Sequence, residues 1–148
     1  MALLAIGFNL PYARLAATFD YPAILREPAP AILGAFTAGG PGLVATWYAF
    51  ALSAILFAPV AVAQAFALGR LRRWPELAAG AALAGAFAGV LQAMGLLRWI
   101  TAVPALATAP EPEAALAAIH AWGGVGIGEH LGQIATALHV ALMDGILS

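Results

Sequence analysis

The sequence contains no cysteine and no lysine, and only 9% of its residues are charged. The absence of cysteine excludes disulfides, iron–sulfur clusters and thiolate metal sites, and it leaves the redox compartment open. The net charge is −1, which provides no broad basic surface, so nucleic acid is not expected as a partner. Soluble domains are about 25% charged, so the usual hydrated surface cannot be built from this composition.

Hydrophobic residues make up 64% of the chain, against roughly 45–50% in an ordinary soluble domain. Two long stretches, 43–68 and 77–97, contain no charged residue. As helices, both are long enough to cross about 30 Å of hydrocarbon. They could instead form the core of a large soluble protein, but this chain is too short to surround both with a polar layer. We therefore expect an all-α, polytopic transmembrane bundle that forms one domain over residues 1–148.

A third span is expected over residues 121–143, although Glu129, His130 and His139 lie within it. One ionised side chain at mid-membrane costs about 2.5–3.5 kcal/mol, while a Leu or Ile returns only about 0.3–0.6 kcal/mol. Several apolar side chains must therefore offset each charge, unless Glu129 is neutral or paired. Residues 1–13 form either a short additional span or the apolar core of a signal peptide that lacks the usual basic residues.

The placement of arginine predicts the orientation of the spans. Arg70, Arg72 and Arg73 lie together between the first two strong spans, and basic residues in short loops tend to stay in the cytoplasm. The junction between the second and third spans then lies on the outer side. The four tryptophans fall near the predicted span ends, where we expect them at the membrane interface with their ring N–H groups in water. They are Trp47, Trp74, Trp99 and Trp122.

Glycines recur every four residues in two of the expected spans. The second span carries Gly85 and Gly89, and the third carries Gly124, Gly128 and Gly132. Such a ridge lets another helix approach closely, either in general packing or as a specific dimer motif. Three spans leave glycine faces uncovered, so besides lipid we expect a second copy of the chain or other membrane helices as partners.

Polar side chains also share helix faces. At 100° per residue, Glu129, Gln133 and Thr136 lie close together beside the glycine ridge, and Gln92 lies on the face of Gly85. In a membrane such side chains must meet each other or water. They therefore form interhelical hydrogen bonds or line a polar cavity, and the sequence leaves both interpretations open.

Arg98 ends the second span and Glu129 lies about two turns inside the third, so both belong to the outer leaflet. The guanidinium is expected to share two hydrogen bonds with the carboxylate. With His130 they form a predicted polar centre, which is either a structural ion pair or a protonatable or ligand-binding site. No metal ion or cofactor is expected, because the acid and the histidines point in different directions on one helix. His139 is expected to be packed, and His120 to be an exposed loop residue.

Five segments follow one another in the order FDYPAILREP, WYAFALSAILFAPVAVA, MGLLRW, VPALA and GEHLG. In this order they resemble the bacterial integral membrane family DUF4386, a domain of unknown function, over most of residues 11–140. The resemblance implies a helical protein of the bacterial inner membrane. It assigns no role to Arg98, Trp99, Glu129 or His130. Members of that family usually carry further spans at both ends, so the resemblance also implies a shortened chain.

Three functions remain open. We expect a structural or ligand-binding bundle ahead of an enzyme, with its polar centre in the outer leaflet. A proton-coupled transporter would use Glu129 and would need a wet path from Glu129 to Gln64 or Asp144. An intramembrane hydrolase would need His130 within hydrogen-bond reach of Glu129 or of an ordered water. The sequence names no catalytic residue, substrate or ligand.

Overall fold

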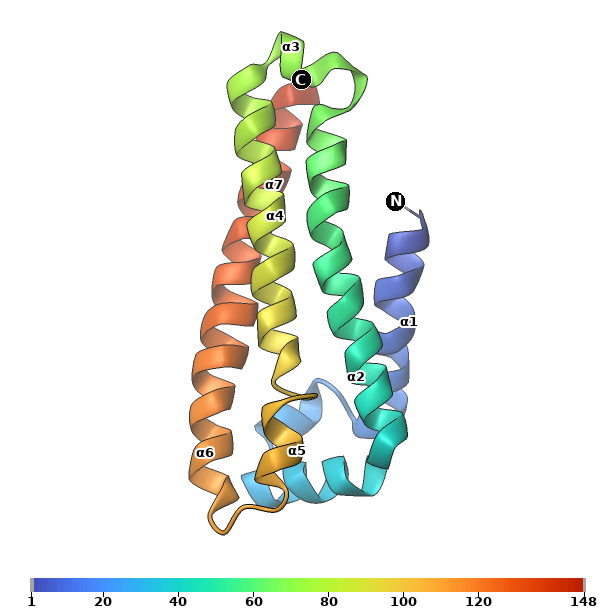
Figure 1. Ribbon diagram of the computed structural model, residues 1–148, viewed down its shortest axis with the longest axis vertical. Coiled ribbons are helices and arrows are strands. Elements are labelled where there is room, and N and C mark those ends of the chain that lie inside the picture. The colour runs from blue at the N-terminus through green and yellow to red at the C-terminus, as the bar shows by residue number, and fades with distance from the viewer. Residues whose placement is uncertain (1, 148) are drawn as a thin grey trace.

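The computed structural model describes residues 2–147, with the side chains of residues 6–67 and 69–146. Met1, the first residue of the expected N-terminal span, lies outside the described residues. All regular structure in the described part of the chain is helical, which confirms the all-α class. The long helices run along the long axis of the molecule (Figure 1). They are α1 (Ala2–Phe19), α2 (Ala29–Phe66), α4 (Pro75–Leu97) and α7 (Gly132–Leu147).

Helix α2 consists of two helices that meet at Gly40. This glycine has φ 56° and ψ −156°, a conformation that side-chain-bearing residues rarely adopt. Its first part lies across one end of the molecule, and its second part rises along the long axis (Figure 1). Pro59 also lies inside α2, where a proline removes a backbone hydrogen bond. The backbone nevertheless keeps helical dihedral angles there, so the departure from helical geometry occurs at Gly40. The expected span 43–68 thus corresponds to the second part of α2.

Short elements join the long helices at both ends. At one end the chain passes through η2 (Ala67–Gly69) and α3 (Arg70–Arg73). There the Arg70 Nη1 donates to the carbonyl of Gln64 over 2.7 Å, which satisfies one of the last carbonyls of α2. At the other end lie η1 (Ala23–Arg26), α5 (Ala102–Leu106) and α6 (Pro112–Ile119).

The third expected span lies inside a longer helical run. Helix α6 continues without a break into η3 (His120–Leu131), a π-helix, and then into α7. Two segments in the described chain, Ala29–Phe66 and Pro75–Leu106, are long and apolar enough to cross a membrane. Hydropathy therefore supports two of the three strong spans, and the third crossing stays a prediction.

Helix α4 packs between α2 and α7, and α1 packs against α2. The largest apolar cluster lies where α1, α2 and the end of α4 meet. At its centre the rings of Trp47 and Trp99 stack with centroids 4.7 Å apart and planes 8° from parallel. Phe19 meets both rings edge-on, an arrangement that aromatic quadrupoles favour. This stack holds the end of α4 against α2.

The tryptophan rings do not all reach the surface of the molecule, as their spacing suggested. Trp74 and Trp122 are exposed, but Trp47 and Trp99 are 0% and 1% exposed. Their ring nitrogens are buried without a hydrogen-bond partner. The expectation that these two N–H groups reach water is wrong, because mutual stacking and the packing of Phe19 enclose both rings.

The glycine ridges do meet other helices closely, but not each other. Gly85 and Gly89 face α2: a Cβ at Gly89 would lie 2.8 Å from the backbone nitrogen of Ala58. The other ridge meets α4 near its end, where a Cβ at Gly128 would lie 2.8 Å from the Cα of Gly95. Other helices approach both ridges closely, and Gly95 is a partner that the four-residue spacing did not reveal.

Candidate ligand pocket

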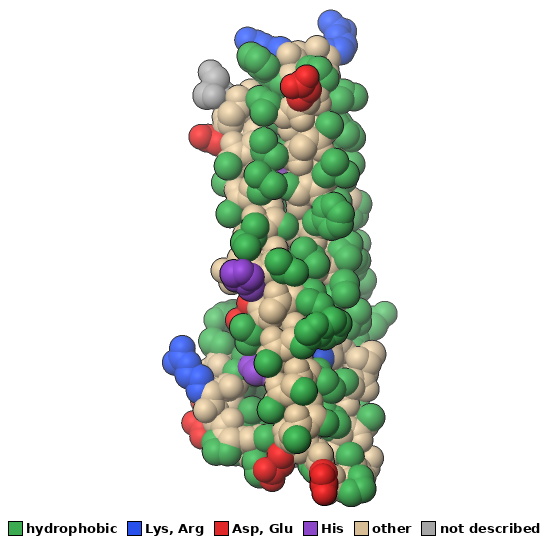
Figure 2. All heavy atoms as spheres, turned by 90° about the vertical axis from the view of Figure 1, so that its left-hand side faces the viewer, with side chains coloured by type: hydrophobic (Ala, Val, Ile, Leu, Met, Phe, Trp, Pro, Cys, Tyr) green, Lys and Arg blue, Asp and Glu red, His purple; other side chains and the backbone are tan. Residues whose placement is uncertain are grey.

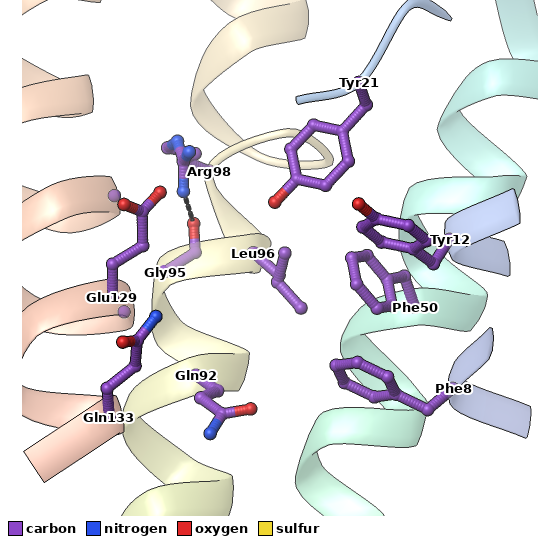
Figure 3. Close-up of a pocket in the computed structure, with 12 residues that line it drawn as sticks. Phe8, Tyr12, Tyr21, Phe50, Gln92, Gly95, Leu96, Arg98, Glu129 and Gln133 are labelled. Carbon is purple, nitrogen blue, oxygen red and sulfur yellow. Dashed lines mark hydrogen bonds between the residues drawn. The ribbon is translucent and has the colours of Figure 1, made fainter. Parts of the chain in front are cut away.

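A pocket of about 220 Å³ opens between α1, the turn after it, α2, α4 and the run from η3 into α7 (Figure 3). Arg98, Glu129, Gln92 and Gln133 contribute its charged and amide groups, and all four are sequence-predicted site residues. Aromatic and aliphatic side chains form the opposite wall (Figure 3). The lining residues are Phe8, Tyr12, Tyr21, Phe50, Gln92, Gly95, Leu96, Arg98, Gly124, Gly128, Glu129 and Gln133.

Arg98 is the buried cation of this pocket. It follows the last residue of α4 and is 7% exposed. Its Nη1 donates to the carbonyl of Gly95 (Figure 3), and its Nη2 lies 3.4 Å from the Nδ1 of His120. Because arginine has no acceptor, Nδ1 must be the unprotonated nitrogen of His120 in this contact. The guanidinium carbon lies 5.2 Å from the ring centroid of Trp99, within cation–π range.

The glycine ridge makes room for this arginine. A Cβ at Gly124 would lie 2.7 Å from the guanidinium carbon of Arg98. Any side chain at position 124 would therefore push the guanidinium from its place. The arginine Nε has no hydrogen-bond partner although it is buried, so the fold leaves part of the hydrogen-bonding capacity of Arg98 unused.

Glu129 lies on the wall of the pocket and is exposed there. The two hydrogen bonds expected between its carboxylate and Arg98 do not form. The guanidinium instead turns its Nη atoms to Gly95 and His120. Within the described residues the Glu129 carboxylate has neither a hydrogen bond nor an ion pair. Figure 3 shows its carboxylate pointing along the wall toward the end of the pocket that Arg98 occupies.

The remaining predicted polar residues divide between two roles. Gln92 donates from Nε2 to the Thr136 hydroxyl over 2.9 Å, and that hydroxyl donates to the carbonyl of Gly132 over 2.8 Å. The first of these bonds ties α4 to α7, and the second lies within α7. Gln133 lies on the pocket wall beside Glu129 (Figure 3). On neighbouring parts of one helical run, Thr136 thus takes part in an interhelical hydrogen bond, while Glu129 and Gln133 line the pocket.

Two of the three histidines differ from their expected roles. His130 is exposed and does not line the pocket, so it does not join Arg98 and Glu129. His120, expected as an exposed loop residue, is half-buried in the helical run and contacts Arg98. The expected faces follow from 100° per residue, and the π-helix η3, in which hydrogen bonds run from i to i+5, departs from that value.

The aromatic wall was not predicted as part of the site. Tyr12 and Tyr21 meet edge-on with centroids 5.7 Å apart, and Phe8 meets Phe50 at 4.7 Å. Burial raises the pKa of the Tyr21 hydroxyl, and the negative charge of Glu129 raises it further. The phenol therefore stays neutral at physiological pH and can donate a hydrogen bond into the pocket.

A family model described as a domain of unknown function, DUF4386, matches residues 1–147. The chain belongs to the DUF4386 family. The match covers nearly the whole chain, which is more than the stretch of residues 11–140 that carried the resemblance. No curated protein and no solved structure matches it. The role of the pocket in this DUF4386 chain therefore has to be argued from its own residues.

The third histidine of this DUF4386 chain is structural, as expected. His139 is buried and donates from Nδ1 to the carbonyl of Ala81 over 2.8 Å, and Phe57 meets its ring edge-on. Within residues 2–147, no three histidine or acidic side chains come together in a way that could hold a metal ion. The pocket thus offers one cation, one acid, two amides and two phenols for binding a ligand.

Proposed function

We propose that the chain is a multi-pass helical protein of the bacterial inner membrane, with a pocket in its outer half that binds a small ligand. Its exposed hydrophobic surface supports the membrane location, because monomeric soluble proteins rarely expose large contiguous apolar patches. Large apolar side chains remain exposed along the three helices α2, α4 and α7. They include Tyr48, Leu52, Leu83, Phe87, Val90, Ile134, Leu138 and Val140.

The distribution of charge supports the same placement. Figure 2 shows charged side chains mainly toward the two ends of the molecule, with hydrophobic and uncharged side chains along the middle. The end that carries Arg70, Arg72 and Arg73 would face the cytoplasm. The opposite end, where Glu111 and Glu113 precede and begin α6, would face outward, and the pocket would then lie in the outer leaflet.

The run from α6 through η3 to α7 would form the third crossing. Glu129 is the main obstacle, because an ionised side chain exposed to lipid is expensive. Its place on a pocket wall with Arg98 and Gln133 lowers that cost, since water or a ligand can solvate it there. Leu131, Ile134 and Leu138 remain exposed beside it and favour insertion.

The unpaired state of Arg98 and Glu129 carries the proposal that the pocket binds a ligand. A structural ion pair would satisfy both groups within the protein. Here the acid has no hydrogen bond within the described residues, and the buried arginine keeps an unpartnered Nε. Both groups line one pocket. Arg98 is buried, where an uncompensated charge is costly, so a ligand that brings a negative group to Arg98 and a positive group to the exposed Glu129 would be stabilised on binding.

The contacts below the pocket favour binding over transport. A transporter would need a wet path from Glu129 toward Gln64 or Asp144. Between those levels α4 touches the backbone of α2 at Gly89, where a Cβ would lie 2.9 Å from the carbonyl oxygen of Ala54. His139 fills the space beside α4 further along. A hydrolase has no specific support either, because His130 does not share the pocket with Glu129.

Cysteine accessibility tests this proposal, because the chain has no native cysteine. In the Gln133→Cys variant, a membrane-impermeant thiosulfonate added from the outside should label the pocket, since the reagent attacks a hydrated thiolate. The matched control is Leu138→Cys, which is also exposed on α7 but faces the proposed lipid surface and should not react. Equal labelling of the two positions, or none at position 133, would refute the water-filled pocket.

A further inference from the structure

Arg98 and Glu129 present opposite charges to one pocket without pairing with each other. Three contacts hold the guanidinium. Nη1 donates to the carbonyl of Gly95, Nη2 contacts the Nδ1 of His120, and Gly124 packs against the guanidinium carbon. It is therefore fixed in position and cannot swing freely toward the acid. The Glu129 carboxylate is exposed on the adjoining wall. The fold thus keeps a fixed positive group and a separate negative group apart.

The groups around these two charges complement a dipolar ligand. The neutral Tyr21 hydroxyl points into the pocket (Figure 3) and can donate to an oxyanion beside Arg98. On the other wall, the Gln133 amide lies next to Glu129 (Figure 3), and its carbonyl oxygen can accept a hydrogen bond from an ammonium group. Tyr12 points its hydroxyl toward the same space from the opposite wall (Figure 3), and a hydroxyl oxygen can accept a hydrogen bond from an ammonium group.

We infer that the pocket binds a small zwitterion, with its ammonium group at Glu129 and its carboxylate or phosphate at Arg98 and Tyr21. This inference rests on the proposed function and names the ligand class. The volume of about 220 Å³ is below the roughly 300–1,000 Å³ of pockets for drug-sized ligands. It suits an amino acid or the polar head of a lipid.

Charge balance favours a zwitterion over ligands that carry a single charge. The charges of Arg98 and Glu129 cancel, so a neutral zwitterion leaves the occupied pocket neutral and gives each group a partner. A monoanion would pair with the arginine but leave the acid unpaired, and an organic amine would do the reverse. In a medium of low dielectric constant, an uncompensated charge is strongly unfavourable.

Two sources could supply this chemistry. A free amino acid would enter from the outer aqueous side, whereas the headgroup of phosphatidylethanolamine would enter from the outer leaflet. Both carry an ammonium group that donates hydrogen bonds and an oxyanion. Phosphocholine has the same charges, but its quaternary ammonium cannot donate a hydrogen bond to Glu129, so it serves as the control for the lipid source.

The test is calorimetric titration of the full chain in detergent. The zwitterionic probes are alanine, leucine and glycerophosphoethanolamine; the controls are propionate, ethylamine and glycerophosphocholine. At least one zwitterion should bind more tightly than its control analogues. Binding of alanine or leucine would identify the amino-acid source, and binding of glycerophosphoethanolamine but not glycerophosphocholine would identify the lipid source.

The decisive variant is Glu129→Gln, which keeps the shape of an exposed side chain and removes its charge. We expect the zwitterion to bind about 10- to 100-fold more weakly, because a hydrogen bond to a charged group is lost. Propionate should bind better than to the wild type, because the pocket now carries a net positive charge. Glu76→Gln removes the same charge from an exposed position in the first turn of α4 and should change neither affinity.

The inference is overturned if none of the three zwitterions binds the wild type, or if Glu129→Gln binds them as the wild type does. The labelling of Gln133→Cys separates this failure from failure of the proposed function. A labelled position 133 with no zwitterion binding would leave a water-filled pocket with a different ligand. An unlabelled position 133 would remove the pocket itself.

Discussion

At the scale of single residues, the site depends on how Arg98 is held. Its place at the end of a long apolar helix was predictable, since charge is scarce in this sequence and one arginine ends a long apolar stretch. Its contacts were not, because they depend on His120 and Gly124, which approach from another helix. A hydrogen-bond partner 22 residues away leaves no local pattern in the sequence.

Arg98→Lys should destabilise the fold although it keeps the charge. A lysine ammonium lacks the planar fork that reaches Gly95 and His120 together. We expect a loss of about 1–3 kcal/mol in the free energy of unfolding, measured by denaturant titration in detergent. Arg72→Lys, at an exposed position in α3, is the control and should have little effect. Equal stability of the two variants would contradict the assigned role of Arg98.

The tryptophans offer a second test at this scale. The Trp74→Phe/Trp122→Phe variant keeps the Trp47–Trp99 pair, and the Trp47→Phe/Trp74→Phe/Trp99→Phe variant keeps only Trp122. The two variants should differ in bilayers that contain brominated lipid. Trp122 is 71% exposed and should be quenched strongly, whereas Trp47 and Trp99 are enclosed and should be quenched weakly. Strong quenching of Trp47 or Trp99 would show that the stacked pair does not form in the membrane.

At the scale of secondary-structure elements, the sequence predicted the lengths of the helices better than it predicted which side chains share a helix face. The uncharged stretch 77–97 matches α4 within two residues at its start, because apolar length determines where a span lies. Two features departed from a regular α-helix: the break in α2 at Gly40 and the π-helix η3. Both occur in glycine-rich segments, where backbone freedom is greatest, and the π-helix altered which side chains share a face.

Glycine contacts between α4 and η3 should be sensitive to added volume. A Cβ at Gly95 would lie 2.6 Å from the Cα of Gly128, so Gly95→Ala forces two backbones apart and should cost about 1–3 kcal/mol. Gly34→Ala is the matched control, because a Cβ there meets nothing within 4 Å. It should leave the free energy of unfolding unchanged or raise it slightly. Similar results for both variants would argue against this helix contact.

The hydrogen bond between Gln92 and Thr136 should contribute only modestly. A double-mutant cycle with Gln92→Leu and Thr136→Val should give a coupling energy of about 0.6 kcal/mol, the average for such bonds in membrane helices. Unfolding titrations of the wild type, the two single variants and the double variant measure it. A coupling energy of zero would mean that the bond does not join α4 to α7 in the folded protein.

At the scale of the whole molecule, the site combines residues that the sequence keeps far apart. The amide and charged groups were predictable, because polar side chains in apolar helices must contact each other or water. The aromatic wall from α1 and Tyr21 was not, because apolar residues there resemble ordinary core residues. The turn containing Tyr21 brings it over the end of α4, and only the tertiary fold shows this (Figure 3). Association with a second copy or with other membrane helices stays a prediction.

Labelling of two cysteine variants in intact bacterial cells tests the proposed orientation, in which the chain crosses the membrane with its pocket end outward. Glu113→Cys, at the pocket end, should react with a membrane-impermeant maleimide added to the cells. Arg72→Cys, at the opposite end, should react only after the inner membrane is permeabilised. Labelling of both positions in intact cells, or of position 72 alone, would contradict this orientation and the outward-facing pocket with it.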